Sequence, residues 1–581
     1  MKANSLFATA RLRGLRSGLA LLVAVGLVGC APKPKANTGT QGLATVSEKE
    51  TVATAAPADV AESTASRDGA EQAVTPVEVS PASQVAMTGT LLYSQHCGAC
   101  HGENGDGNGR AALFLFPKPR DFRGGRFKLI GNPNSVPTAA DIEAVLVRGM
   151  PGSSMPSWAH LPAEQRGLLV DEVLRMFRDG AQERYVKSLR DDGGMSDEDL
   201  ASEETQQDIA DTVAAMTTPD EPSEVPPLGD GGPEAIARGK ELYVKQSCHS
   251  CHGNEGRGDG VQQMIDENGL PTRPRDLTQG IYKGGHDAAS LYRRLYLGMP
   301  GTPMPSSQTL TGQQLVDLAH FLRSLSTEEQ RNAAIIERRS LAVKRIQQAP
   351  SDPGDPAWSS APATAVQLMP LWWRDGEHLV EVAALHDGAN IAVRLSWRDA
   401  TENNAAVRPD EFEDMAALQI FAGADEPFLG MGAATTALDL WQWRAGTAAT
   451  GAEDQLSDEY PFDTEEYRRL AGGKPLPDFV TARAGGNPLA TRETSASNLV
   501  AGGHGSLTFR PKASQIVKAK AVWSDGKWSV VFQRPLSVNQ ADGVALDAGG
   551  QYSAAFAIWD GESHDRAAQK AISIWNDLTL E

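Results

Sequence analysis

The sequence predicts a multidomain protein in which two small all-α domains precede an all-β domain, most simply a two-sheet sandwich. A segment that begins near a C-x-x-C-H motif and ends in an amphipathic helix occurs twice, which indicates an internal duplication. Short alternating segments then replace the helical pattern. At 581 residues the chain exceeds what one hydrophobic core can organise. The predicted domains span residues 88–190, 232–347 and 352–581.

The first 29 residues are typical of a secretory signal. Basic residues such as Lys2 and Arg11 precede an apolar run at 19–28 that is too short to span a bilayer. The run ends in LVGC, which resembles the lipobox of bacterial lipoproteins, whose cysteine is acylated. We therefore expect a lipoprotein signal peptide at 1–29, a lipid on Cys30, and an anchor to the periplasmic side of the cell envelope. Because Ala31 rather than an aspartate follows, the resemblance implies the outer membrane.

Two segments have the composition of linkers. Residues 30–87 are rich in small and polar residues without periodicity, which predicts a flexible tether. Residues 191–231 contain 13 acidic residues and no Lys or Arg, which predicts a self-repelling acidic linker. The formal net charge of −20 argues against nucleic acid as a partner, because little here would neutralise phosphates.

Four of the five cysteines lie in the two C-x-x-C-H motifs. A redox dithiol needs no adjacent histidine, zinc needs further ligands nearby, and structural disulfides leave the histidine unexplained. The motif is the attachment sequence of a c-type haem, so the sequence predicts two covalent haems. His101 and His252 are the expected proximal iron ligands. The thiols expected to bind the porphyrins are Cys97, Cys100, Cys248 and Cys251.

Both helical units resemble small class I cytochrome c domains. GTLLYSQHCGACHGENGDGNG and GKELYVKQSCHSCHGNEGRGDG are similar to the first helix and haem-attachment loop of that family. There a methionine in a G-x-x-M-P setting supplies the sixth ligand, which Met155 and Met304 match. A thioether favours ferrous iron and raises the reduction potential. Met150 and Met299, five residues earlier in each copy, remain alternatives.

Other residues of the helical units have structural interpretations. His160 and His286 have no counterpart in the other copy and are expected at the surface, whereas His320 is expected as a satisfied residue of a packing helix. Amphipathic helices are predicted at 163–179 and 311–325. A charged helix is predicted over 328–346, leading to the last domain.

From residue 352 onward, six segments bounded by Gly, Asp, Asn or Pro are predicted as strands. They are HLVEVAAL, NIAVRLSW, AALQIFAG, LDLWQW, KWSVVFQR and YSAAFAIW. DPAWSSAPATAVQL, ALHDGANIAVRLSWRDAT, PFLGMGAATTALDLWQWRAG and WDGESHDRAAQKAISIW resemble the haem b domain of the ethylbenzene dehydrogenase type. That family comprises gamma subunits of molybdenum enzymes and binds a non-covalent haem through one methionine and one lysine. The matching residues are Met431 and Lys570. His386 and His564 are spare candidates, both expected to be exposed.

Alternation in KAISIW places Lys570 on the same face as Ile572 and Ile574, hence inward. A buried ammonium needs a partner or must be neutral, and an iron–nitrogen bond can displace its proton. The alternative is a strand-end lysine whose amine reaches water.

The sequence contains no phosphate loop, nucleotide-binding glycine fingerprint, zinc-protease helix or nucleophile elbow. The three predicted haems therefore indicate an electron-transfer protein rather than an enzyme. The resemblance implies exchange of electrons with iron–sulfur and molybdopterin subunits of an oxidoreductase, and through the c haems with another redox carrier. Two alternatives stay open: a dihaem cytochrome whose sandwich binds carbohydrate or protein without haem, and a dihaem peroxidase.

Overall fold

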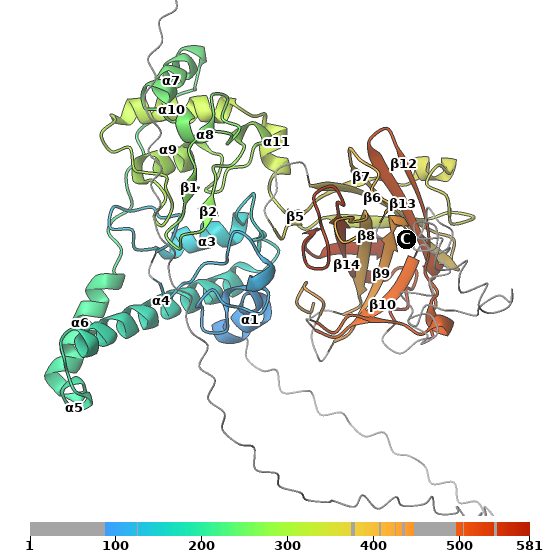
Figure 1. Cartoon of the computed structure of the whole chain (residues 1–581), viewed down its shortest axis with the longest axis horizontal. Helices are drawn as coiled ribbons and strands as arrows, with labels where there is room; N and C mark the ends of the chain where they lie inside the picture. The colour runs from blue at the N-terminus through green and yellow to red at the C-terminus, as the bar shows by residue number, and fades with distance from the viewer. Residues whose placement is uncertain are drawn as a thin grey trace, which may run out of the picture. The chain divides into compact units, whose positions relative to one another are not determined.

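The computed structural model describes residues 88–124, 126–372, 378–405, 408–423, 426–432, 436–446, 496–503, 505–539 and 543–581. The predicted signal, Cys30 and the predicted tether lie outside these residues. A helical part is followed by a large β-sheet part (Figure 1). Among the described residues, no helix has both the length and the apolar character that crossing a membrane requires.

The first helical domain is held together by α1 and α4, which pack on one another. Thr138 forms a capping box with Asp141 at the start of α3, and Gly149, at φ 72°, ends that helix. Its elements are α1 (Gly89–His96), α2 (Gly98–His101), η1 (Ala112–Phe114), α3 (Ala139–Arg148) and α4 (Ala163–Asp191). Its core contains Leu92, Tyr93, Ile142, Leu146, Leu169, Val170, Val173 and Met176.

The second helical domain repeats this plan, with α7 packed on α10. Thr311 forms a capping box with Gln314 at the start of α10, and Gly298, at φ 70°, ends α9 as Gly149 ends α3. Its elements are α7 (Pro233–Lys245), α8 (His249–His252), β1 (Met264–Ile265), β2 (Pro271–Thr272), η2 (Leu277–Gln279), α9 (Ala288–Leu297), α10 (Gly312–Ser324) and α11 (Glu328–Ala333). The predicted amphipathic helices are thus confirmed as α4 and α10, and α4 runs on to Asp191.

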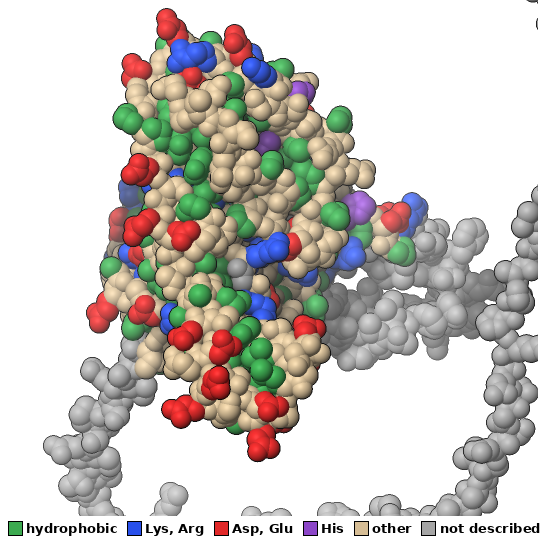
Figure 2. Space-filling model, turned by 90° about the vertical axis from the view of Figure 1, so that its left-hand side faces the viewer, with side chains coloured by type: hydrophobic (Ala, Val, Ile, Leu, Met, Phe, Trp, Pro, Cys, Tyr) green, Lys and Arg blue, Asp and Glu red, His purple; other side chains and the backbone are tan. Residues whose placement is uncertain are grey.

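The predicted acidic linker is helical in its first part, whereas residues 218–232 contain no helix or strand. It forms α5 (Asp197–Ala201) and α6 (Glu203–Thr217), and α6 packs against α4. Ser196 and Ser202 cap the two helices, and acidic residues in the first turns favour helix there because they face the positive end of the helix dipole. Leu200 and Ile209 are buried, so a sparse apolar stripe outweighs the charge. Acidic side chains gather at the end of the molecule where these helices lie (Figure 2).

The β-sheet part is one continuous hydrogen-bonded network of 14 strands among the described residues, rather than two separate sheets. Its order is β11-β10-β9-β8-β14-β16-β3-β6-β7-β13-β12, with β4 on β6 and β15 between β14 and β5. β14 pairs antiparallel with β8 along one edge, and along its other edge with β16 through residues 551–554 and with β15 through residues 557–558. Strands from both ends of this order contribute to a single core that includes Trp397, Trp441, Trp443 and Trp528.

All six predicted strands are confirmed; they are β6, β7, β8, β9, β13 and β14. The strands are β3 (Ser340–Arg345), β4 (Thr364–Gln367), β5 (Met369–Pro370), β6 (Leu379–His386), β7 (Asn390–Arg398), β8 (Met415–Phe421), β9 (Leu438–Arg444), β10 (Ala496–Ala501), β11 (Thr508–Phe509), β12 (Lys518–Ser524), β13 (Lys527–Pro535), β14 (Gln551–Trp559), β15 (Ala571–Ile572) and β16 (Asn576–Leu580). Short 3-10 helices, η3 (Pro356–Ser360) and η4 (Lys512–Ser514), complete the domain.

The helix predicted over 328–346 is wrong beyond α11. Residues 340–345 form β3, which pairs parallel with β16 on one side and β6 on the other. Leu341 and Val343 alternate inward and are buried, a period of two that charged neighbours hide in the sequence. The β-sheet domain therefore begins before residue 352, with a strand that lies inside the sheet.

Candidate haem centres

The first C-x-x-C-H motif forms the short helix α2, directly after α1. The backbone N–H groups of Cys100 and His101 donate to the carbonyl of Cys97, and the Tyr93 hydroxyl donates to the carbonyl of Gly102 at 2.9 Å. These bonds fix both thiols and the histidine on one rigid turn. Burial raises the pKa of Cys97 to about 12 and of Cys100 to about 11, as an apolar pocket does to a thiol.

His101 is oriented as a proximal ligand requires. Its Nδ1 lies 2.9 Å from the backbone carbonyl oxygen of Arg120, so the tautomer protonated on Nδ1 leaves Nε2 free for iron. The ring stacks on Phe122 with centroids 4.5 Å apart. Burial lowers the pKa of His101, which favours the neutral imidazole that coordinates metal.

A tight loop after α3 presents the methionines. The N–H of Met150 donates to the carbonyl of Met155 at 2.9 Å, and a Cβ on Gly149 would meet that carbonyl oxygen at 2.7 Å, so only glycine fits. Met155 packs against the core cluster that also contacts Cys97, and Met150 is not part of that cluster. Both line the cavity described below. The packing favours Met155 as the sixth ligand, and that assignment stays a prediction.

The second motif repeats this geometry. The Tyr243 hydroxyl donates to the Gly253 carbonyl at 2.6 Å, and the N–H of Met299 donates to the carbonyl of Met304 at 3.2 Å. Met304 packs on the same core cluster as Cys248. One difference separates the copies: Nδ1 of His252 is buried without a hydrogen-bond partner among the described residues. Its ring is therefore held less firmly than that of His101.

In the β-sheet domain, Met431 and Lys570 line one cavity although 138 positions separate them in the chain. Met431 lies in a turn at φ 78°, closed by a bond from the N–H of Gly432 to the carbonyl of Phe428 at 3.0 Å. The turn is tied to the neighbouring strand region because the N–H of Gly503 donates to the Met431 carbonyl at 2.8 Å.

The Lys570 ammonium faces the cavity close to an aromatic ring. Nζ lies 4.8 Å from the Trp559 ring centroid and 3.3 Å from the Ala567 carbonyl oxygen, and no carboxylate pairs with it in the described part of the chain. Burial lowers the pKa of Lys570 to about 8. Ile572 and Ile574 line the same cavity, but so does Ser573, because strand β15 ends at Ile572 and the alternation does not continue beyond it. A lysine whose proton is removed more easily than usual, on the same cavity as a thioether, is a donor set that suits iron.

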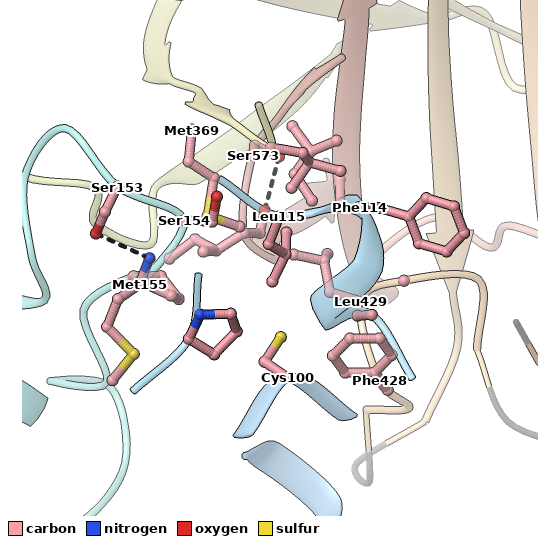
Figure 3. Close-up of a pocket in the computed structure, with 18 of the residues that line it drawn as sticks. Cys100, Phe114, Leu115, Ser153, Ser154, Met155, Met369, Phe428, Leu429 and Ser573 are labelled. Atoms are coloured by element: carbon pink, nitrogen blue, oxygen red, sulfur yellow. Dashed lines mark hydrogen bonds between the residues drawn. The ribbon is translucent and has the colours of Figure 1, made fainter. Parts of the chain in front are cut away.

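The two sites open into each other. One cavity of about 870 Å³ is lined by the first C-x-x-C-H motif and Met155 and also by Met431 and Lys570. Figure 3 shows Cys100 and Met155 of the first helical domain together with Phe428 and Leu429 of the β-sheet domain. This volume is near the upper end of ordinary ligand pockets. The remaining wall is mostly apolar, as a porphyrin requires, and includes Leu115, Met369, Phe428 and Leu429. The residues present fit haem at both ends.

Direct contacts between the first helical domain and the β-sheet domain enclose this cavity. The N–H of Phe116 donates to the Leu371 carbonyl at 2.9 Å, and the Phe116 ring stacks on Trp372. The Ser154 hydroxyl donates to the Pro370 carbonyl at 3.0 Å. The sequence gives no sign of this junction, because its residues are scattered over both domains and carry no motif.

The histidines differ in part from expectation. His160 is exposed and His320 is buried, its Nε2 2.6 Å from the Leu228 carbonyl oxygen, as predicted. His286 is half-buried rather than at the surface. His386 is fully buried at the end of β6, with Nε2 2.8 Å from the Glu581 carbonyl oxygen, so its predicted exposure is wrong. His564 is exposed as expected.

Three family models match the chain. Ethylbenzene dehydrogenase matches residues 355–571, cytochrome c matches 236–326, and cytochrome c oxidase, cbb3-type, subunit III matches 84–171. A protein of Haloferax mediterranei named as a respiratory nitrate reductase heme subunit is 24% identical over 233 residues, which are 39% of this chain and 67% of the relative. Chlorate reductase subunit gamma of Ideonella dechloratans is 24% identical over 234 residues, 39% of this chain and 77% of that one.

Solved structures give weaker likenesses. A chain of a reducing HAO-like protein complex from Kuenenia stuttgartiensis is 32% identical, with a TM-score of 0.33, over 41% of this chain and 96% of that one. A family 9 carbohydrate-binding module from Caldicellulosiruptor kristjanssonii is 9% identical, with a TM-score of 0.22, over 42% of this chain and 94% of that one. The family matches and the motif geometry agree region by region. Residues 84–171 and 236–326 are similar to cytochrome c domains and residues 355–571 to the ethylbenzene dehydrogenase family, and together these matches support a haem-based electron-transfer role.

Proposed function

We propose that this protein is a lipid-anchored electron-transfer subunit on the periplasmic side of the cell envelope. It relays electrons between a molybdopterin oxidoreductase with iron–sulfur subunits and another redox carrier, and it is not itself the catalytic subunit. Bound haems supply one-electron chemistry, with Met431 and Lys570 holding a b haem and the two C-x-x-C-H motifs holding c haems. Both curated relatives carry the names of reductase subunits, which supports an oxidoreductase partner.

The shared cavity is the observation that carries the proposal. Because the first C-x-x-C-H motif and Lys570 line the same cavity, the b site adjoins the first c site. A short path of hydrogen bonds connects the regions of Met155 and Lys570. Ser154, next to Met155, donates to the Pro370 carbonyl, and the next residue, Leu371, donates its N–H to the carbonyl of Lys570 at 2.9 Å. Two hydrogen bonds thus join the neighbourhoods of two predicted axial ligands.

The second helical domain reaches the same cavity from the other side. Lys283 of that domain lines it beside Arg120 and Lys128 of the first domain. Burial and these cationic neighbours hold the pKa of Lys283 well below its usual range. Buried cations need anionic partners, and haem propionates are suitable ones. The Arg120–Glu267 ion pair, at 2.6 Å, also joins the two helical domains. The order of the relay is therefore b haem, first c haem, second c haem.

Two variants of the full chain test this order. Cys248→Ala with Cys251→Ala removes the second attachment site, and Cys97→Ala with Cys100→Ala removes the first. After photoreduction, the distinct absorption bands of b and c haems report equilibration between them. We expect fast b-to-c equilibration without the second c site and at least a tenfold slower one without the first. Equal rates in the two variants, or the reverse ranking, would overturn the proposed order.

A further inference from the structure

Three acidic side chains meet at one end of the β-sheet domain, away from the haem ligands in the sequence. Asp399 directly follows β7, Asp414 directly precedes β8, and Asp560 directly follows β14. One carboxylate oxygen from each lies within 4.8 Å of those of the other two. Asp414 is fully buried and Asp399 is 8% exposed. No Lys or Arg pairs with any of the three among the described residues.

Two of the three carboxylates have hydrogen-bond donors around them. Asp414 accepts hydrogen bonds from the backbone N–H groups of Asn403 and Gly561, both at 2.8 Å, and from the Trp528 indole at 2.9 Å. Asp560 accepts from the backbone and the hydroxyl of Ser563, at 3.1 and 2.7 Å. Hydrogen bonds to a carboxylate favour its charged form, but at Asp414 burial outweighs them and raises the pKa. A cation at this position would offset that cost of burial.

Asp399 is supported on one side only. Its Oδ1 accepts from the N–H of Thr401 at 3.2 Å, whereas its buried Oδ2 makes no bond of ordinary hydrogen-bond geometry within the described residues, although the Trp397 side chain interacts with this carboxyl. Leaving a buried carboxylate oxygen without a partner is unfavourable. Burial, followed by the charges of Asp414 and Asp560, raises the pKa of Asp399 to about 7, against the opposing hydrogen bonds from the Thr401 N–H and the Trp397 side chain.

We propose that Asp399, Asp414 and Asp560 bind a Ca²⁺ ion. Calcium takes carboxylate oxygens at about 2.3–2.6 Å in irregular geometry, so two oxygens on opposite sides of one ion are about 4.6–5.2 Å apart, which accommodates the observed spread without movement. The donors are all oxygen, with no thiol or imidazole, which suits a hard cation rather than zinc or copper. The ion would neutralise the three carboxylates and complete the coordination of Asp399 Oδ2.

The site would also support the b-haem pocket. Met415 follows Asp414 and Trp559 precedes Asp560, and both Met415 and Trp559 line the haem cavity. The loop that begins at Asp560 leads to Lys570. A cation that ties the ends of β7, β8 and β14 together therefore fixes the base of the segment that presents the proposed iron ligand.

Calcium binding to the purified full chain, first stripped with EGTA, tests the proposal by calorimetry and by metal analysis after dialysis. We expect one Ca²⁺ per chain, and a rise of about 5–10 °C in the unfolding midpoint of the β-sheet domain when Ca²⁺ exceeds its Kd a hundredfold. Asp399→Asn should abolish both effects. The matched control is Asp525→Asn, an exposed turn residue whose left-handed backbone suits asparagine, which should keep both.

The direction of the change in the unfolding midpoint distinguishes a loss of Ca²⁺ binding from misfolding of the variant. In EGTA, Asp399→Asn removes one of three repelling carboxylates, so its unfolding midpoint should equal or exceed that of the wild type. It should then gain nothing from Ca²⁺. Absence of bound Ca²⁺ in the wild type, unchanged Ca²⁺ binding in Asp399→Asn, or a site that takes Mg²⁺ but not Ca²⁺ would overturn the proposal.

Discussion

Lys570 should make retention of the b haem depend on pH, with a break near pH 8. Only the neutral amine can bind iron, so its proton must leave first. With a pKa of about 8, deprotonation at pH 7 costs about 1.4 kcal/mol, whereas a lysine with the ordinary value of 10.5 needs about 4.8 kcal/mol. The cavity therefore offsets up to about 3 kcal/mol, reduced by whatever water in the cavity screens.

The sign follows from the lowered pKa. Well above pH 8 the amine is neutral and haem affinity should be flat. Below pH 8 the affinity should approach a tenfold fall per pH unit, which amounts to about fiftyfold from pH 8 to pH 6. Transfer of haem from the holoprotein to excess apomyoglobin measures this, because covalent c haems cannot transfer. Lys570→Ala should release haem quickly at every pH, and Lys518→Ala, at an exposed position on β12, should behave as wild type.

Two results would refute this reasoning. One is release from the wild type that is independent of pH between 6 and 8, which would mean that Lys570 is not a ligand. The other is a break near pH 10.5, which would mean that the cavity does not depress the lysine pKa. In haem-free protein, burial of the ammonium destabilises the fold fully below pH 8, so Lys570→Met should raise the free energy of unfolding at pH 7. That advantage should be lost progressively between about pH 8 and the ordinary lysine pKa of 10.5.

Three further substitutions, two of them with matched controls, test the c sites and the junction. Met155→Ala should abolish the thioether-to-iron charge-transfer band and lower the reduction potential of one c haem by roughly 100 mV or more, within the ~0.8 V that axial ligands span. The control Met150→Ala should keep the band, and the reverse result would assign Met150 as the ligand. Gly109→Ala would place a Cβ 2.3 Å from a backbone carbonyl oxygen of the first C-x-x-C-H turn and should reduce haem attachment there, measured by mass spectrometry. Gly167→Ala, with open space around the added Cβ, should keep both haems and stabilise α4 by up to ~1 kcal/mol. Ser154→Ala removes the bond to the β-sheet domain and should slow b-to-c equilibration at unchanged potentials, so unchanged kinetics would exclude this route.

The sequence predicts features whose signal is local. Six strands were predictable because inward and outward residues alternate between turn residues, and the helices α4 and α10 because apolar residues recur at helical spacing. The C-x-x-C-H motifs directly indicate haem attachment. The inward direction of Lys570 was predicted from Ile572 and Ile574, and all three residues line the cavity.

Features that depend on distant partners were not predictable. The residues of β3 were predicted as part of a charged helix. They form a strand because β16, more than 230 positions later, supplies their hydrogen-bond partners. Net charge predicted a linker where α5 and α6 form and each buries one apolar residue, Leu200 and Ile209. The joint cavity and the three converging carboxylates combine residues from separate segments, and no single stretch of sequence carries either signal.

The most direct test of this account is the haem content of the purified full chain, measured by pyridine haemochrome spectra before and after acid–acetone extraction. The account predicts three haems per chain, of which two stay with the polypeptide as c haems and one is extracted as b haem, and it predicts that Lys570→Ala loses only the extracted one. Two haems with nothing extractable from the wild type would contradict it, because the cavity between Met431 and Lys570 would then serve no haem of its own.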